Sequence, residues 1–195
     1  MSFAQPKATT TIFMGSPRKH SNTHLLAEEA GRALTERGVF VRYVYLDELT
    51  IRDCCGCHGC RNGTNAPCSL DDDMQGIYQM IRKSDGIIVA APVYFGYVPA
   101  MTKAWLDRLV PFIGPGMRPV LPAEKQVSFI FVQNMPDPGL FLPGLRSFMD
   151  SVAMTGLSVR DILVATDCEA GEKPMATDRP DLMERAYAIG RDLLV

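Results

Sequence analysis

The chain has 195 residues, a formal net charge of −2 and 47% hydrophobic residues, which are ordinary values for a globular domain. There is no basic surplus to neutralise a phosphate backbone, so we expect no nucleic-acid partner. The sequence has neither an apolar run of membrane-spanning length nor a signal peptide, so we expect a cytoplasmic protein without a membrane segment.

Apolar runs alternate with amphipathic stretches along the chain. Runs rich in β-branched and aromatic residues predict strands at 9–14, 39–46, 86–91, 126–132 and 157–165. Helical periodicity predicts helices at 22–37, 71–83, 98–113, 140–154 and 181–194. Such alternation indicates one α/β domain over residues 1–195, with a doubly wound parallel sheet of flavodoxin-like order 2-1-3-4-5 between two helical layers.

In such a sheet a ligand binds beyond the carboxyl ends of the strands, where the direction of winding reverses. For this strand order the reversal lies beside the first and third strands. The two segments to inspect therefore follow Met14 and Ala91.

The first of these segments reads Gly15-Ser16-Pro17-Arg18-Lys19-His20-Ser21-Asn22-Thr23. It offers hydroxyl groups, a guanidinium group and the positive end of a helix, which together favour a phosphate. Ser21 or Asn22 is expected to cap that helix, and Lys19 and His20 are expected to face solvent. The loop has neither the Gly-Lys-Ser/Thr ending of a Walker loop nor the Gly-x-Gly-x-x-Gly dinucleotide pattern. A capped turn without a ligand is the alternative.

The second segment contains Pro92-Val93-Tyr94-Phe95-Gly96. Tyr94 and Phe95 can cover a flat ring, and Gly96 allows the main chain to approach it closely. Aromatic residues at a strand end often belong to the edge of the core, but the expected position beside the phosphate loop favours a ring site. Residues 133–137 follow the fourth strand and are expected, by position alone, to flank the ring.

The string GSPRKHSNT resembles the phosphate loop, G-S-P-R-x-x-S-N-T, of the NADPH-dependent FMN reductases and iron–sulfur flavoproteins. The string PVYFGYVPAMTKAWLDR is similar to the second signature of that family. The resemblance implies FMN, with its phosphate held by Ser16, Arg18, Ser21, Asn22 and Thr23. It implies that the ring and its side chain contact Pro92, Val93, Tyr94, Phe95 and Gly96. It also implies NAD(P)H as a co-substrate and a homodimer or a dimer of dimers.

Five of the six cysteines lie in a loop at residues 53–70, before the second predicted helix. The spacing Cys-x2-Cys-x2-Cys-x7-Cys, formed by Cys54, Cys57, Cys60 and Cys68, favours a [4Fe–4S] cluster. Tetrahedral zinc and ordinary thiols are the alternatives. The motif resembles that of iron–sulfur flavoproteins, in which an Asp-Asp-Met helix start follows it.

The residues around this motif carry further expectations. Cys55 lies outside its frame, and Cys168, far along the chain, is expected to be structural. Asp71, Asp72 and Asp73 are expected to lie at the positive end of the second helix. Clustered thiols without a secretory signal indicate a reducing compartment.

The sequence therefore predicts an FMN-dependent oxidoreductase that passes electrons from NAD(P)H to a flavin, a quinone or another acceptor. Because the flavin carries the chemistry, no catalytic side chain is expected. The alternative is an electron carrier in which FMN and a [4Fe–4S] cluster relay single electrons.

Overall fold

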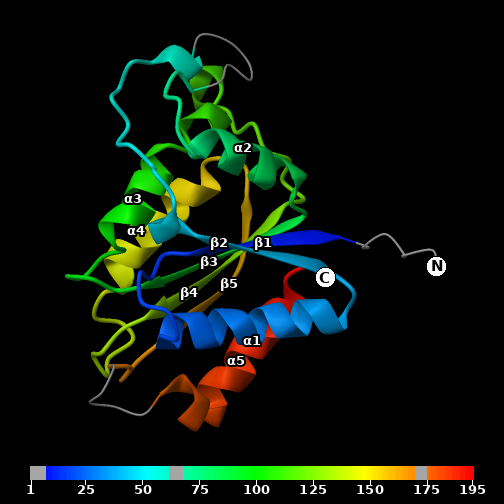
Figure 1. The fold of residues 1–195 in the computed structure, drawn as a ribbon, viewed down its shortest axis with the longest axis vertical. Coiled ribbons are helices and arrows are strands. Elements are labelled where there is room, and N and C mark those ends of the chain that lie inside the picture. Colours follow the sequence, from blue (N-terminus) through cyan, green and yellow to red (C-terminus); the bar gives the residue numbers. More distant parts are fainter. Residues whose placement is uncertain (1–7, 62–67, 170–174) are drawn as a thin grey trace.

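The five strands of the computed structural model form one parallel sheet, in the order β2-β1-β3-β4-β5 (Figure 1). The model describes residues 8–61, 68–169 and 175–195. The strands are β1 (Thr9–Met14), β2 (Phe40–Tyr45), β3 (Gly86–Pro92), β4 (Gln126–Val132) and β5 (Ser158–Ala165). The predicted order is confirmed, and each strand begins and ends within one residue of its predicted bounds.

Helices cover both faces of the sheet, as Figure 1 shows. One face carries α1 (Asn22–Glu36) and α5 (Pro180–Asp192), and the other carries α2 (Met74–Lys83), α3 (Ala100–Asp107) and α4 (Leu142–Ala153). Side chains alternate between the faces with the period of two of a strand. Phe13 accordingly packs on the side of α3, while Ile12 and Met14 pack on the side of α1.

Three predicted helices are at least three residues shorter than expected, and the fourth of the chain covers only Leu142–Ala153 of the predicted 140–154. The second begins at Met74 and not at Asp71, because Asp72 and Asp73 hold other parts of the chain, as described below. The third ends at Asp107 and is followed by a 3₁₀ turn at Val110–Phe112. Pro111 lacks the amide hydrogen that a continuing α-helix would need.

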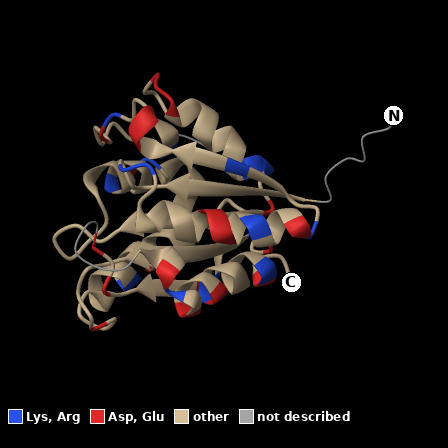
Figure 2. Ribbon diagram, turned by 60° about the horizontal axis from the view of Figure 1, so that its bottom comes forward, with Lys and Arg blue, Asp and Glu red and all other residues tan. Residues whose placement is uncertain are grey.

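Acidic and basic residues alternate along the helices and are not sorted by sign (Figure 2). No helix in the described ranges combines the length and the apolar character that crossing a bilayer requires.

Candidate functional site

A cleft of about 410 Å³ is lined by segments that follow β1, β3, β4 and β5. This volume lies within the range of small-molecule sites. The structure brings both predicted loops into its wall. The predicted residues that line it are Ser16, Arg18, Ser21, Asn22, Thr23, Pro92, Val93, Tyr94 and Phe95.

The phosphate-loop side of the cleft is already ordered by its own hydrogen bonds. Ser16 is buried, its hydroxyl lies 3.1 Å from that of Ser21, and it accepts a 3.3 Å hydrogen bond from the amide of Arg18. Gly15 is required by close packing, because a Cβ atom there would lie 2.3 Å from Oγ1 of Thr102. The loop therefore folds tightly against the amino end of α3.

The amino end of α1 points its first amide groups at this loop. Ser21 is the N-cap residue, as predicted, but its hydroxyl makes no capping bond and lies 3.1 Å from Nδ1 of His24. Amides of the first helical turn have no partner within the helix, so they can donate to an anion. Asn22 plays a structural part as well, because its Oδ1 accepts a 2.6 Å hydrogen bond from the amide of Ala176. Lys19 is exposed, as predicted, and pairs with Glu48.

The ring side of the cleft is formed by a tight turn after β3. Tyr94 and Tyr97 exchange backbone hydrogen bonds of 2.8 and 3.1 Å across Phe95 and Gly96. Both central residues have positive φ, +52° at Phe95 and +83° at Gly96, and the Phe95 side chain is fully exposed. The structure does not bring Gly96 into the cleft. Gly96 lines an adjacent hollow of about 420 Å³ together with Met135 and Phe141.

Gln133, just after β4, leaves one buried hydrogen-bond acceptor unused. Its Nε2 donates to the carbonyls of Met135 at 3.1 Å and Asp137 at 2.7 Å, but Oε1 has no partner among the described residues. A buried acceptor without a donor is costly, so a ligand N–H group that reached it would be favoured. Cys168, expected to be structural, is buried and also lines the cleft, where Glu169 adds a carboxylate.

These features fit FMN. The hydroxyls, the guanidinium group of Arg18 and the helix amides suit its phosphate. The aromatic turn suits a flat ring, and the unused Oε1 of Gln133 suits a ring N–H group. Residues 133 and 134 therefore join the site, as their position after β4 predicts.

The five loop cysteines line a second, smaller cavity of about 150 Å³. It brings together Cys54, Cys57, Cys60 and Cys68, and it includes Cys55, which the motif spacing had set apart. Residues 62–67 of this loop lie outside the described residues. Within the described ranges, no three His, Cys, Asp or Glu side chains are grouped to hold one metal ion.

The thiols experience different surroundings. The hydroxyl of Ser69, 3.1 Å from Sγ of Cys57, and the backbone at Gly59 lower the pKa of Cys57. Burial raises the pKa of Cys60, and the nearby Cys68 thiol raises it further. A single zinc ion requires four ligands that converge on one point, whereas a [4Fe–4S] cluster is held by four thiolates spread around it. The thiols that line this cavity are of the donor type that a [4Fe–4S] cluster takes.

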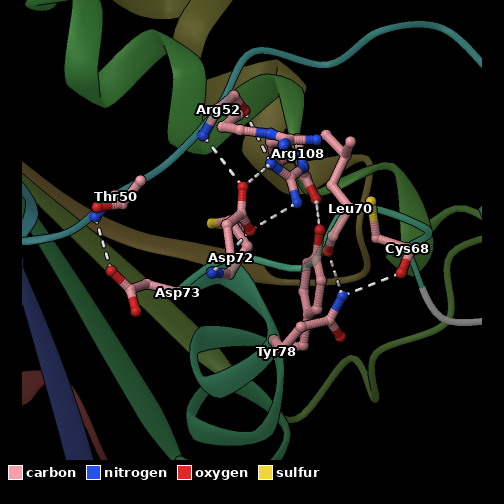
Figure 3. Close-up of polar contacts among 10 residues, drawn as sticks. Thr50, Arg52, Cys68, Leu70, Asp72, Asp73, Tyr78 and Arg108 are labelled. Atoms are coloured by element: carbon pink, nitrogen blue, oxygen red, sulfur yellow. Dashed lines mark hydrogen bonds and ion pairs between the residues drawn. The ribbon is translucent and has the colours of Figure 1, made fainter.

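A buried ion pair closes the base of the cysteine loop, and sequence reasoning missed it (Figure 3). Arg108 binds Asp72 through both terminal guanidinium nitrogens, at 2.6 and 2.9 Å, and one of them also donates to the carbonyl of Arg52 at 2.8 Å. The Asp72 and Arg108 side chains are only 2% and 1% exposed. Burial acts to raise the pKa of Asp72, but the hydrogen bonds from Arg108 and Arg52 outweigh it, so that the pKa is lowered.

Further bonds surround this ion pair. Asp73 accepts a 2.7 Å hydrogen bond from the amide of Thr50, and Gln75 donates to the carbonyls of Cys68 and Leu70. Asp72 and Asp73 do lie at the amino end of α2, as expected, since Asp73 is the N-cap residue and Asp72 accepts a 3.2 Å hydrogen bond from the amide of Met74. They also tie the start of α2 to the chain before the loop. The sequence offered one signal for this ion pair, because Arg108 is the last residue of the second family signature. Its partner, Asp72, lies 36 residues away, so no local pattern connects the two.

A model of the NADPH-dependent FMN reductase family matches residues 9–132, more than half of the chain. The protein belongs to this family. It is 43% identical over 100 residues to an iron–sulfur flavoprotein of Methanosarcina thermophila, covering 51% of each chain. It is 38% identical over 97 residues to one of Methanocaldococcus jannaschii, covering 50% of this chain and 49% of that one. The chain thus spans about half the length of these curated relatives.

Solved structures show the same fold at lower identity. An NAD(P)H:quinone oxidoreductase from Methanothermobacter marburgensis superimposes with a TM-score of 0.72 and 18% identity, covering 95% of this chain and 96% of that one. A flavone reductase gives a TM-score of 0.71 at 18% identity, covering 95% of this chain and 62% of that one. The protein is thus a flavodoxin-like member of an oxidoreductase family.

Proposed function

We propose that the protein binds FMN in the cleft after β1 and β3 and uses NAD(P)H to reduce a flavin, a quinone or another acceptor. The main support is that two loops far apart in the sequence, each resembling a flavin-binding signature, line one cleft. One side of the cleft carries buried hydroxyl groups, and the other carries aromatic side chains. Family membership and the names of the structural neighbours support the same reaction class.

The chain's own residues bind and orient the cofactor in this proposal. Ser16, Arg18 and the first turn of α1 hold the phosphate, and Tyr94 and Phe95 flank the ring. Gln133 accepts a hydrogen bond from the ring edge through its unused Oε1. Bound FMN supplies the transfer of hydride and electrons, so the protein needs no general base.

Two measurements test this function. Fluorescence titration should show much tighter binding of FMN than of riboflavin, because the phosphate loop contributes only to FMN. The FMN-loaded protein should oxidise NADH or NADPH in the steady state when a quinone is supplied. Equal affinity for the two flavins would reject the phosphate site, and absent turnover with every acceptor would reject the reductase.

A second candidate function is an electron carrier that holds FMN and a [4Fe–4S] cluster. The cavity lined by all five loop cysteines favours it, and so do the relatives named iron–sulfur flavoproteins. The absorption spectrum of protein purified without oxygen reports flavin and cluster together. Cluster absorption with negligible NAD(P)H turnover supports the carrier, and flavin absorption alone rejects it.

We further propose that the protein is a homodimer or a dimer of dimers in the cytoplasm. Exposed apolar side chains at Phe95, Met135 and Leu140 lie on the loops around the ring side of the cleft, where a second copy would cover them. The five loop cysteines form no disulfide bond among the described residues, which suits a reducing compartment. Light scattering coupled to gel filtration measures the assembly, and a monomer at all concentrations would reject it.

A further inference from the structure

One segment of the chain contacts both candidate sites. The tight turn at 94–97 lies at the cleft, α3 begins three residues later at Ala100, and Arg108 follows the last residue of that helix. Beyond it, Val110 forms part of the wall of the cysteine cavity. The turn, the helix and its end therefore form one continuous support between the flavin cleft and the cysteines.

The guanidinium of Arg108 joins the two ends of the cysteine loop. It donates to the carbonyl of Arg52, before the loop, and to the carboxylate of Asp72, after it. The amide of Arg52 also donates to Asp72, so these three residues form a closed set of hydrogen bonds (Figure 3). Tyr78 holds the backbone of Arg108 in place with a 2.7 Å hydrogen bond to its carbonyl.

The cysteines beyond this ion pair are held by fewer contacts. Cys54 is two residues beyond Arg52 and is exposed, and Cys68 is four residues before Asp72. The separation of the first and last cysteines of the motif therefore depends on how the loop ends are held. A bidentate guanidinium–carboxylate pair fixes both distance and angle, which a lysine could not do in the same way.

We propose that Arg108 is a positioning residue for the cysteine loop, which holds Cys54 and Cys68 around one cavity so that a [4Fe–4S] cluster can bind and stay bound. This inference rests on the proposed cluster, but the arrangement of the thiols can also be tested without iron. The role concerns geometry and does not depend on whether the protein acts as a reductase or as a carrier.

The main test removes the ion pair without leaving one charge buried alone. The double variant Arg108→Met/Asp72→Leu replaces both partners with apolar side chains, a change that buried pairs often tolerate. After anaerobic reconstitution with iron and sulfide, we expect it to bind FMN like the wild type and to lose iron to a chelator at least ten times faster. Iron loss at the wild-type rate from folded, FMN-loaded double variant would overturn the proposal.

A matched control lies on the same helix. Lys103 and Asp107 form an exposed i,i+4 ion pair at 2.5 Å, and Lys103→Gln/Asp107→Asn should leave iron loss unchanged. If the apolar double variant does not fold, Arg108→Lys is the second test, since it keeps the charge but not the planar fork. It should release iron faster than the wild type, and release at the wild-type rate would overturn the proposal.

An iron-free measurement separates this inference from the cluster itself. In a chain with Cys55, Cys57 and Cys60 replaced by Ser, a short bifunctional maleimide should cross-link Cys54 to Cys68 within one chain. The Arg108→Met/Asp72→Leu changes should slow this reaction at least five-fold. If the wild type holds no iron, the cluster proposal fails. If the double change also leaves the rate of Cys54–Cys68 cross-linking unchanged, the positioning role of Arg108 is overturned as well.

Discussion

The flavin cleft and the cysteine cavity differ in how much of each site exists before a ligand binds. In the cleft, Ser16, Asn22 and Thr23 are buried, and Ser16 and Asn22 already take part in hydrogen bonds within the protein. In the cysteine loop, Cys54, Cys55 and Cys57 are exposed, and within the described ranges no three potential ligands are grouped around one ion.

This difference follows from where the residues lie in the fold. The phosphate loop is the direct continuation of a central strand and the start of a helix, so folding of the sheet fixes it. The cysteine loop extends from the layer of α2 and α3 and is held at its base by Asp72 and Arg108 (Figure 1). The shape of the cleft should therefore not change when residues of the cysteine loop are replaced. The cluster site, in contrast, should become ordered only when the thiolates bind iron.

The largest expected effect is loss of the cluster from one substitution. Cys57→Ser should reduce the iron content from about four per chain to near zero, since a [4Fe–4S] cluster needs four thiolates. FMN binding should not change, because the cleft does not use this loop. Iron analysis and flavin absorption on the same sample measure both, with Cys55→Ser as the control that keeps its iron. Iron loss from both variants alike would show that the motif spacing does not select the ligands.

A smaller effect is expected for the phosphate. Arg18→Ala should weaken FMN binding by about 1.5–3 kcal/mol, the value of a hydrogen bond to a charged group. Riboflavin affinity should stay the same, because riboflavin has no phosphate, and this comparison serves as the internal control. Titration of flavin fluorescence gives both constants. Equal FMN affinity in Arg18→Ala and wild type would remove Arg18 from the site.

The turn beside the ring should respond to a single added methyl group. Gly96→Ala places a Cβ at φ +83°, which costs about 1–2 kcal/mol for a residue other than glycine, although the nearest atom, in Phe141, is 3.4 Å away. We expect this loss in urea unfolding, together with weaker FMN binding. Gly76→Ala is the control, because Gly76 lies within α2 with open space around it. This variant should be slightly more stable than the wild type. A Gly96→Ala variant as stable as the wild type would show that the turn relaxes.

The sequence predicted the strands, their order and the two loops of the cleft, because each of these follows from local patterns. Buried parallel strands are apolar over their whole length, and the loops carry motifs of adjacent residues. Gln133 could be placed beside the cleft only by its position after β4. Its Oε1 is left without a partner because Nε2 is directed at the carbonyls of Met135 and Asp137. No local sequence pattern specifies where those carbonyls lie.

The pairing of Arg108 with Asp72 could not be predicted in this way. Both residues are of types usually found at the surface, and the contact between them requires the assembled layer of α2 and α3. The three aspartates instead favoured a longer α2. The cysteine spacing predicts four ligands of one cluster, which stays a prediction. It could not reveal that Cys55 lines the same small cavity as those four cysteines.

The smallest expected effect concerns pH and the buried imidazole below the phosphate loop. Burial lowers the pKa of His24 from its ordinary value of 6.5, although Glu28 and Asp47 oppose the shift, and His20 and Lys19 add slightly to it. His24 stacks on Tyr45 and touches the hydroxyl of Ser21, while its Nε2 has no partner in the described part of the chain.

Because its folded-state pKa is depressed, His24 is neutral in the folded protein at pH values where the unfolded chain already binds a proton. The contribution of neutral His24 to the free energy of unfolding is therefore fully present above pH 6.5, and it is lost as the pH falls through the lowered pKa. Urea unfolding between pH 7.5 and 5 should show this decline, and His24→Gln should flatten it. His58→Gln is the control, since His58 is exposed in both states. The lowered pKa of Asp72 contributes a separate loss only below its ordinary value of 3.8. An identical pH dependence in His24→Gln and wild type would show that His24 does not couple the phosphate loop to pH.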